Sequence, residues 1–298
     1  DYLNAENDYT AAHTGHLDAM TENIFQEIKS RIKQTDMSVP ARRGKYWYYG
    51  RSEEGKNYGY SCRIPVEEGS DPWTAPGIPE EGSPEGEEII LDANALAEGK
   101  DFFALGAASI SDSGRYLAYS VDFAGDERFE LSIKDLDTGD LLEDHLTGIF
   151  YGATWAGDGY IFYTTVDDAW RPDAVWRHKV GTEQSADVRV FHEADEHFNV
   201  GIGSARSDKY LFIGVGSKIT SEAWVLDTEN PEGEFRPLWK RETGVDYDVD
   251  HAVVGGEDYW IVTHNATGPN FAVGYAKVDA ELPALRDLPE LLVHDDTT

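Results

Sequence analysis

A motif that returns four times constrains the fold of this chain more than any other feature. In each copy a turn rich in Gly, Asp and Ser precedes a tyrosine, and a short apolar run follows. The tyrosines are Tyr116, Tyr160, Tyr210 and Tyr259, which lie 44, 50 and 49 residues apart. A period of about 40 to 50 residues built from short strands is typical of a β-propeller, in which each blade buries its faces only against neighbouring blades. The sequence therefore predicts a mainly β chain whose repeats are four-stranded blades.

Turn residues within each repeat divide it into short strands. In the first repeat, Gly125-Asp126 and Asp137–Gly139 enclose the segment Phe129–Ile133, in which apolar and polar residues alternate. Alternation with a period of two indicates a half-buried strand. We count about five blades: a first blade that starts at residue 37, and later blades near residues 102–146, 147–195, 196–241 and 242–298.

Two segments stand outside the repeats. Residues 1–36 predict a helical segment, in which a helix with its N-cap at Thr21 carries an apolar face. That face consists of Ile24, Phe25, Ile28 and Ile32. Residues 67–88 are rich in Glu, Pro and Gly, and this composition predicts an acidic surface insertion in the first blade.

The charge of the chain restricts its partners. It contains 57 acidic and 25 basic residues, which give a formal net charge of −32. A nucleic acid would be repelled by such a chain, so we expect no nucleic-acid partner. Basic peptides are the partners that the charge favours, and a solvated or salt-adapted acidic surface is the alternative interpretation.

The composition also bears on the cellular compartment of the protein. No run of residues approaches the length of an apolar membrane span, so we expect no membrane partner. Cys62 is the single cysteine, which excludes an intrachain disulfide and fits a reducing compartment. We therefore expect a cytoplasmic protein.

Several segments, in order along nearly the whole chain, resemble the N-terminal part of the prolyl oligopeptidase family, and within it the oligopeptidase B (protease II) group. They are Tyr2–Asn7, Ser38–Tyr49, Gly125–Phe129, Asp135–Gly139, Trp170–Pro172, Trp176–Thr182 and Ser217–Glu222. The resemblance implies a serine peptidase in which a seven-bladed propeller is joined to an α/β-hydrolase domain. It also implies that the intact enzyme cleaves short peptides after Lys or Arg, because the propeller restricts access to a buried active site.

The catalytic residues implied by the resemblance are expected to be absent from this chain, because in the family they lie in the hydrolase domain, after the propeller. No serine here lies in a Gly-x-Ser-x-Gly turn, which would present a nucleophile, and the segment Gly59–Arg63 is the nearest match. His178 and His251 fall in strand patterns and are interpreted as structural residues. We therefore expect no hydrolysis by this chain alone, and peptidase activity in the intact parent protein.

Metal and cofactor motifs are incomplete. Asp246, Asp248, Asp250 and Glu257 have the spacing of a calcium loop, but His251 stands where the sharp turn needs glycine. The segment Gly201–Arg206 begins like a dinucleotide-binding motif and lacks its third glycine. The sequence thus predicts neither a metal site nor a cofactor.

Phe150 is the single residue for which the resemblance implies a role with substrate. It matches in position a phenylalanine with which prolyl oligopeptidases approach the substrate from the propeller side, and a core aromatic between blades is the alternative interpretation. Arg171 is expected to pair with a carboxylate between blades.

Two expectations concern assembly. Five blades of a seven-bladed ring leave an open end, so we expect the chain to self-associate there or through the helix, or to remain partly unfolded at that end. A stand-alone propeller that binds a protein partner, without catalysis, is the alternative function.

Overall fold

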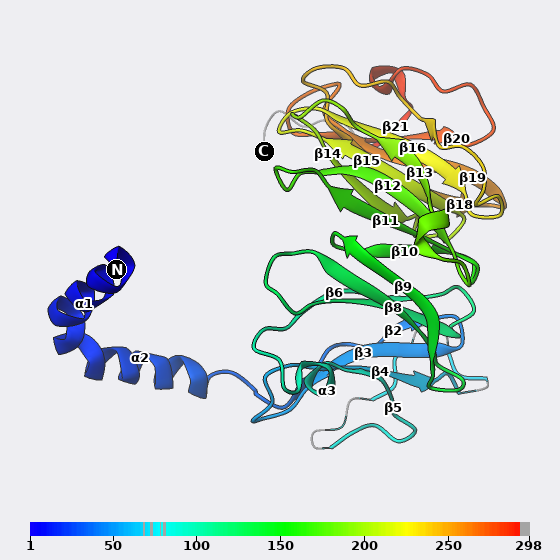
Figure 1. Cartoon of the computed structure of the whole chain (residues 1–298). Coiled ribbons are helices and arrows are strands. Elements are labelled where there is room, and N and C mark those ends of the chain that lie inside the picture. Colours follow the sequence, from blue (N-terminus) through cyan, green and yellow to red (C-terminus); the bar gives the residue numbers. More distant parts are fainter. Residues whose placement is uncertain (68, 72–73, 78, 80–81, 293–298) are drawn as a thin grey trace. The chain divides into compact units, whose positions relative to one another are not determined.

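The structure, a computed structural model, describes residues 1–67, 69–71, 74–77, 79 and 82–292. The chain forms two compact units (Figure 1). Unit 1 comprises Asp1–Arg42 and Tyr46–Leu96, and unit 2 comprises Arg43–Lys45 and Ala97–Thr298. The predicted insertion at 67–88 and the last predicted blade, 242–298, each lie partly outside the described residues.

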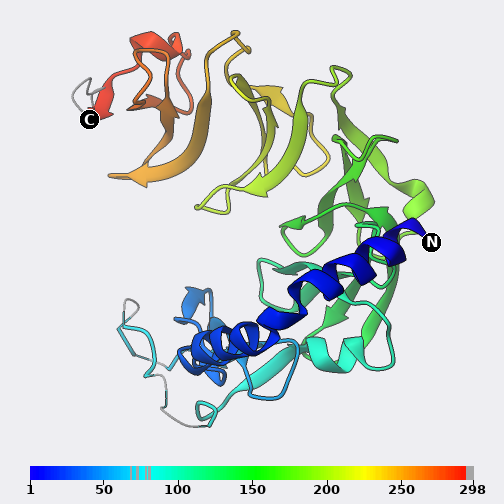
Figure 2. The same ribbon diagram turned by 90° about the vertical axis from the view of Figure 1, so that its left-hand side faces the viewer.

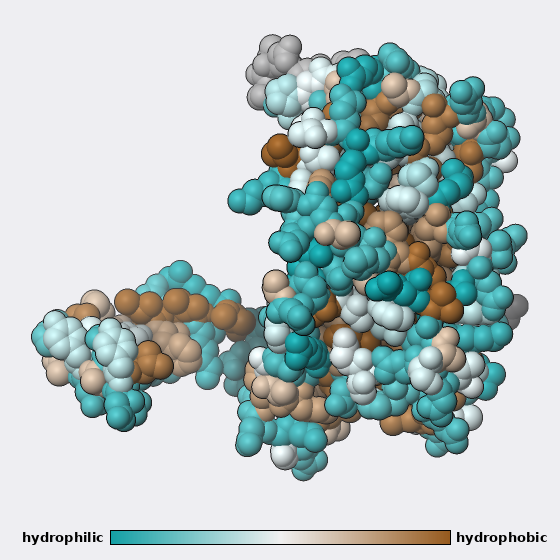
Figure 3. Space-filling view, turned by 45° about the horizontal axis from the view of Figure 1, so that its top comes forward, coloured by the Kyte–Doolittle hydropathy of each residue, from teal (hydrophilic) through white to brown (hydrophobic). Residues whose placement is uncertain are grey.

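Unit 1 begins with the expected helical segment. Helix α1 (Tyr2–Thr14) and helix α2 (Asp18–Ser30) are joined by one 3-10 turn, and none of their side chains is buried. Thr21 was wrongly predicted as an N-cap, because the 3-10 turn leads directly into α2 and places Thr21 inside the helix. The apolar face of α2 is exposed, and apolar surface gathers on the helical segment in Figure 3.

The sheet of unit 1 contains β1 (Asp36–Met37), β2 (Ala41–Arg43), β3 (Tyr46–Ser52), β4 (Tyr60–Pro65) and β5 (Glu88–Asp92), which α3 (Ala93–Ala97) follows. The strand order is β1-β3-β4-β5, with β2 also paired to β3. Alternate residues of β3 and β4 form the core, because successive side chains of a strand point to opposite faces. These core residues are Trp47, Tyr49, Tyr60, Cys62 and Ile64.

Unit 2 contains four antiparallel sheets, in each of which every strand pairs with the next along the chain. The first sheet is β6 (Ala104–Ile110), β7 (Tyr116–Asp122), β8 (Phe129–Asp135) and β9 (Leu141–Ile149). The second is β10 (Ala153–Ala156), β11 (Tyr160–Val166), β12 (Pro172–Lys179) and β13 (Val188–His192). The third is β14 (Asn199–Ser204), β15 (Tyr210–Gly216), β16 (Ser221–Asp227) and β17 (Arg236–Pro237). The fourth is β18 (Tyr247–Val254), β19 (Glu257–His264), β20 (Ala272–Lys277) and β21 (Glu290–Leu292).

The four repeated tyrosines occupy equivalent positions, as the repeat predicts. Each lies on the second strand of its sheet, opposite the last residue of the third strand. The pairs are Tyr116 with Asp135, Tyr160 with Lys179, Tyr210 with Asp227 and Tyr259 with Lys277. A repeat array places matching residues in matching environments, so the sequence period reports the register of the sheets.

Neighbouring sheets of unit 2 bury their apolar faces against each other. Leu131 and Ile161 belong to a core between the first and second sheets, and Phe162 and Leu211 to a core between the second and third. Trp260 lies at the centre of the core between the third and fourth sheets. Figure 2 shows these sheets following one another as blades that do not close into a ring. The expected class, a mainly β propeller preceded by a helical segment, is confirmed, and the expected domain and blade boundaries stay predictions.

Candidate functional site

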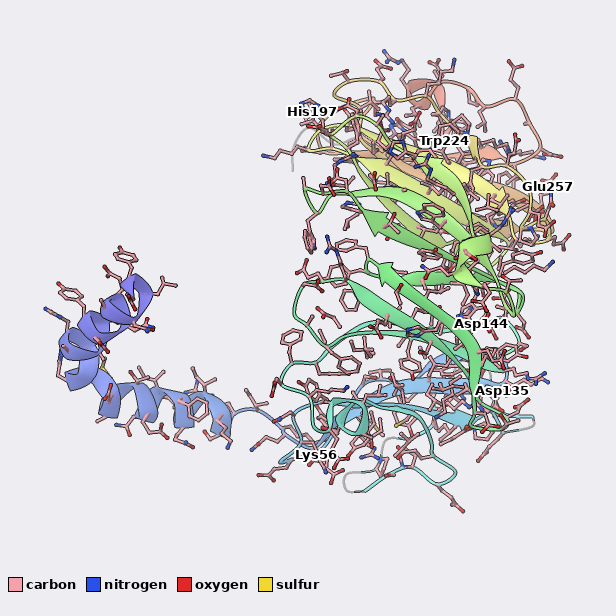
Figure 4. The ribbon with its side chains drawn as sticks, in the orientation of Figure 1. Lys56, Asp135, Asp144, His197, Trp224 and Glu257 are labelled. Carbon is pink, nitrogen blue, oxygen red and sulfur yellow. The ribbon has the colours of Figure 1, made fainter. Side chains whose placement is uncertain are left out.

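The candidate site lies at one end of the blades. Antiparallel strands alternate in direction, so the loop between the second and third strands of a sheet and the connection to the next sheet lie at the same end. Residues 123–128, 150–152 and 167–171 meet there for the first two sheets. His197, in the connection from β13 to β14, and Glu257, the first residue of β19, lie at opposite ends of unit 2 (Figure 4). Phe150, in the connection from β9 to β10, lies at the end marked by His197.

The backbone of the Phe150 connection is fixed on β11. The N–H of Phe150 donates to the carbonyl of Thr164 at 2.8 Å, and the Thr164 hydroxyl donates to the carbonyl of Tyr151 at 3.3 Å. The rings of Phe150 and Tyr151 meet edge to face with centroids 4.5 Å apart, and Tyr151 lies 5.1 Å from the ring of Phe129. Phe150 is half-buried and Tyr151 is 49% exposed. A substrate contact of Phe150 stays a prediction, with Tyr151 as the more accessible ring.

The loop between β7 and β8 is organised by one carboxylate. Asp122 is buried and accepts the N–H groups of Ala124 at 2.7 Å, Gly125 at 2.8 Å and Glu127 at 2.9 Å. Burial by itself raises the pKa of Asp122, but these N–H groups hold it below its usual value. The loop places Glu127 at φ 58°, in the left-handed region that non-glycine residues seldom occupy.

An aromatic side chain from the next sheet meets this loop. Trp170 has φ 66°, a conformation that is unusual for a bulky residue. The guanidinium of Arg128 lies over its ring, 4.3 Å from the centroid. A guanidinium over an aromatic face is held by a cation–π attraction, so this contact joins the loops of two neighbouring sheets.

Arg171 does not pair with a carboxylate between blades, so that prediction is wrong. Its Nε donates to Asp167 of the same loop at 2.9 Å, because the tight turn brings these two residues together. Its Nη1 crosses toward the next sheet and donates to the carbonyls of Phe198 at 2.9 Å and Glu193 at 3.2 Å. The residue therefore orders the connection between two blades through backbone acceptors.

His178 and His251 lie in contacts between neighbouring sheets. The contact around His251 contains a serine, a histidine and an aspartate, which the sequence analysis did not bring together. The Oγ of Ser207 lies 2.8 Å from Nδ1 of His251, and Asp258 lies 3.0 Å from Nε2. In a catalytic triad the hydroxyl meets Nε2 and the carboxylate meets Nδ1, so this arrangement is the reverse. Burial lowers the pKa of His251. Only the folded structure reveals this cluster, because Ser207 is 44 residues from His251.

Among the described residues, no group of three or more His, Cys, Asp or Glu side chains could hold a metal ion. Asp250, from the predicted calcium spacing, instead accepts the N–H of Arg206 at 2.9 Å. In the same part of the chain no helix is long and apolar enough to cross a membrane.

A hollow of about 770 Å³ lies in unit 1. It is lined by Trp47, Ile64 and residues of the 67–88 insertion, including Glu67 and Asp71. Several insertion residues lie outside the described part of the chain, so the blade end of unit 2 remains the better-defined site.

Comparison with known proteins gives consistent matches along the chain. Residues 1–295 match the family described as prolyl oligopeptidase, N-terminal beta-propeller domain. The dipeptidyl aminopeptidase BI of Pseudoxanthomonas mexicana is 36% identical over 99% of this chain and 40% of its own length. Protease 2 of Moraxella lacunata is 33% identical over 91% of this chain and 38% of its own length.

The fold is similar to that of a solved peptidase. Oligopeptidase B from Trypanosoma brucei, in a closed form with covalently bound antipain, superimposes with a TM-score of 0.82. It is 34% identical, and the match covers 99% of this chain and 39% of that one. The chain thus spans about two fifths of the length of the relatives it matches.

Proposed function

The chain belongs to the prolyl oligopeptidase family, whose N-terminal β-propeller domain it matches, and from this premise we propose that it forms the part of a peptidase that selects substrates by size. The match over residues 1–295 carries this proposal. Propeller blades joined by apolar cores are rigid, so a peptide reaches a catalytic domain joined to them only if it is small and extended. Homologues join this domain to a catalytic hydrolase domain in the same chain.

The finer proposal concerns the substrate. We propose that the intact protein cleaves short peptides after Lys or Arg. The net charge of −32 supports this, because a strongly acidic surface raises the local concentration of cationic peptides. Relatives named protease 2 and oligopeptidase B support a peptidase activity, and cleavage after Lys or Arg is what the sequence resemblance to the oligopeptidase B group implies.

A second candidate follows from the relative named dipeptidyl aminopeptidase BI, which is 36% identical. An enzyme of that kind would remove dipeptides from a free peptide N-terminus. The two candidates differ in one requirement, since only the second needs an unblocked α-amino group.

The test uses the longest open reading frame that contains this sequence. Its product is assayed with chromogenic peptides that end in Arg, Lys or norleucine, each with a free and with a blocked N-terminus. Hydrolysis of the blocked Arg and Lys peptides, and inactivity of residues 1–298 alone, is the expected result. A requirement for the free N-terminus would favour the second candidate. If the complete product hydrolyses none of these peptides, the peptidase proposal fails and a stand-alone binding propeller takes its place.

A further inference from the structure

Glu127 is held in a conformation that its own residue type does not favour. A non-glycine residue at φ 58° is strained and persists only where its surroundings fix it. Here buried Asp122 fixes it, by accepting the N–H groups of Ala124, Gly125 and Glu127. The loop therefore fixes the direction in which the Cα–Cβ bond of Glu127 leaves the backbone.

The carboxylate that this loop presents can still accept hydrogen bonds from a ligand. Glu127 is exposed, and its side chain forms no ion pair with any residue that the structure describes. The adjacent Arg128 does not neutralise it, because the guanidinium is stacked on Trp170. Its carboxylate does contact Tyr151: partial burial, the charge of Glu127 and a hydrogen bond between the Tyr151 hydroxyl and this carboxylate raise the pKa of Tyr151.

The surroundings of this carboxylate suit a positively charged group at the end of an apolar chain. Tyr151 is half-exposed and packs against Phe150 and Phe129, so an aromatic wall stands beside the charge. Ammonium and guanidinium groups bind carboxylates by charge-assisted hydrogen bonds and are attracted by aromatic faces. A lysine or arginine side chain places its methylene groups on the same wall.

We propose that Glu127, with Tyr151 and Phe150, is a subsite that binds the cationic group of a short peptide. Its role is to determine specificity rather than to carry out a chemical step. The ligand is an ammonium or guanidinium, which a peptide supplies from a basic side chain or from its free N-terminus. The inference rests on the proposed function, because it assigns a peptide substrate to this face.

Peptide binding to the chain itself tests the subsite. Amide and tyrosine ring shifts are followed by NMR as three dipeptides are added: acetyl-Ala-Lys-amide, acetyl-Ala-norleucine-amide, and Ala-Ala-amide with a free N-terminus. Shifts at Tyr151 with the lysine peptide, and not with norleucine, assign the ligand to the side chain. Shifts with Ala-Ala-amide assign it to the N-terminus.

Variants separate the subsite from the general charge of the protein. Glu127→Gln is expected to weaken binding of the cationic peptide about fivefold, the range of an exposed ion pair. Glu127→Asp keeps the charge and is expected to retain most of the binding. The matched control is Glu257→Gln at the opposite end of the blades, where Glu257 also contacts a tyrosine, Tyr259, at 2.8 Å but is paired with Lys277.

The possible outcomes are distinct. Three results would each overturn the subsite. The wild type and Glu127→Gln bind the cationic peptide equally, Glu257→Gln weakens binding as much as Glu127→Gln does, or the norleucine peptide binds as tightly as the lysine peptide. Amide shifts of Glu127→Gln that match those of the wild type outside residues 123–128 and 150–152 show that the variant folds. If the complete product hydrolyses peptides and Glu127→Gln changes neither KM nor binding, only this inference fails. If the complete product hydrolyses none while binding still depends on Glu127, the subsite stands and the peptidase proposal fails.

Discussion

Replacing His178 by leucine tests a buried polar contact that joins the first two sheets of unit 2. The ring is fully buried, with Nε2 2.9 Å from Asp144 on β9 and Nδ1 2.7 Å from Asp187 beside β13. Asp144 is labelled in Figure 4. A carboxylate oxygen accepts hydrogen bonds, so each ring nitrogen of His178 lies within hydrogen-bond distance of a buried acceptor. Asp187 also accepts the Tyr163 hydroxyl at 2.8 Å.

The expected loss follows from the charges that the variant leaves behind. The side chains of Asp144 and Asp187 are 3% and 2% exposed, so neither gains water when the imidazole is removed. Removing one partner of a buried ion pair costs about 3–5 kcal/mol. We therefore expect His178→Leu to lower the free energy of unfolding by about that amount. Adding Asp144→Asn and Asp187→Asn is expected to restore part of it, because the cost comes from uncompensated charge.

Urea denaturation measures this loss, with the free energy of unfolding extrapolated to water. The control is His197→Leu, since His197 also lies 2.7 Å from a carboxylate, that of Asp195, but its side chain is 87% exposed. That substitution is expected to change stability by less than about 0.5 kcal/mol. A loss below about 1 kcal/mol for His178→Leu, or no recovery when the carboxylates are also replaced, would refute the charge argument.

Three further predictions concern other parts of the chain. A Cβ at Gly106 would lie 2.5 Å from the Ser120 hydroxyl, so Gly106→Ala is expected to lower the free energy of unfolding, measured by urea titration, by about 1–3 kcal/mol. At Gly214 an added Cβ meets no atom within 4 Å, so the control Gly214→Ala should lower it by less. Burial raises the pKa of the Cys62 thiol to about 11, which lowers the population of the reactive thiolate at pH 8. Alkylation by iodoacetamide at pH 8 should therefore be about a hundredfold slower in the folded chain than in urea, and it should accelerate as the pH rises toward 11. Ile28 is 56% exposed on the apolar face of α2, and Ile28→Glu is expected to reduce self-association of the chain. Light scattering measures this in 1 M salt, where the repulsion between acidic chains is screened within about 3 Å. Unchanged scattering would exclude that face as the contact.

Much of the architecture follows from local patterns in the sequence. Tyr116, Tyr160, Tyr210 and Tyr259 mark the second strand of each sheet because a repeated turn and a repeated apolar run produce the same hairpin each time. The helical period of α2 is likewise local, although its N-cap was misplaced by four residues, at Thr21 instead of Leu17. A cap depends on where the preceding turn ends, and the composition of residues 15–17 does not specify that.

The choice of polar partners was decided only by the tertiary structure. With 57 acidic residues in the chain, each basic side chain has many possible partners, and sequence distance does not rank them. Arg171 pairs within its own loop, whereas His178 reaches Asp144, which is 34 residues away. The aromatic position Phe150 came from a family resemblance, but the strained Glu127 beside it did not, because a left-handed backbone at a glutamate leaves no mark in the sequence. Period and apolar pattern therefore determined the blades, while the close approach of distant loops, which requires the folded sheets, determined the site.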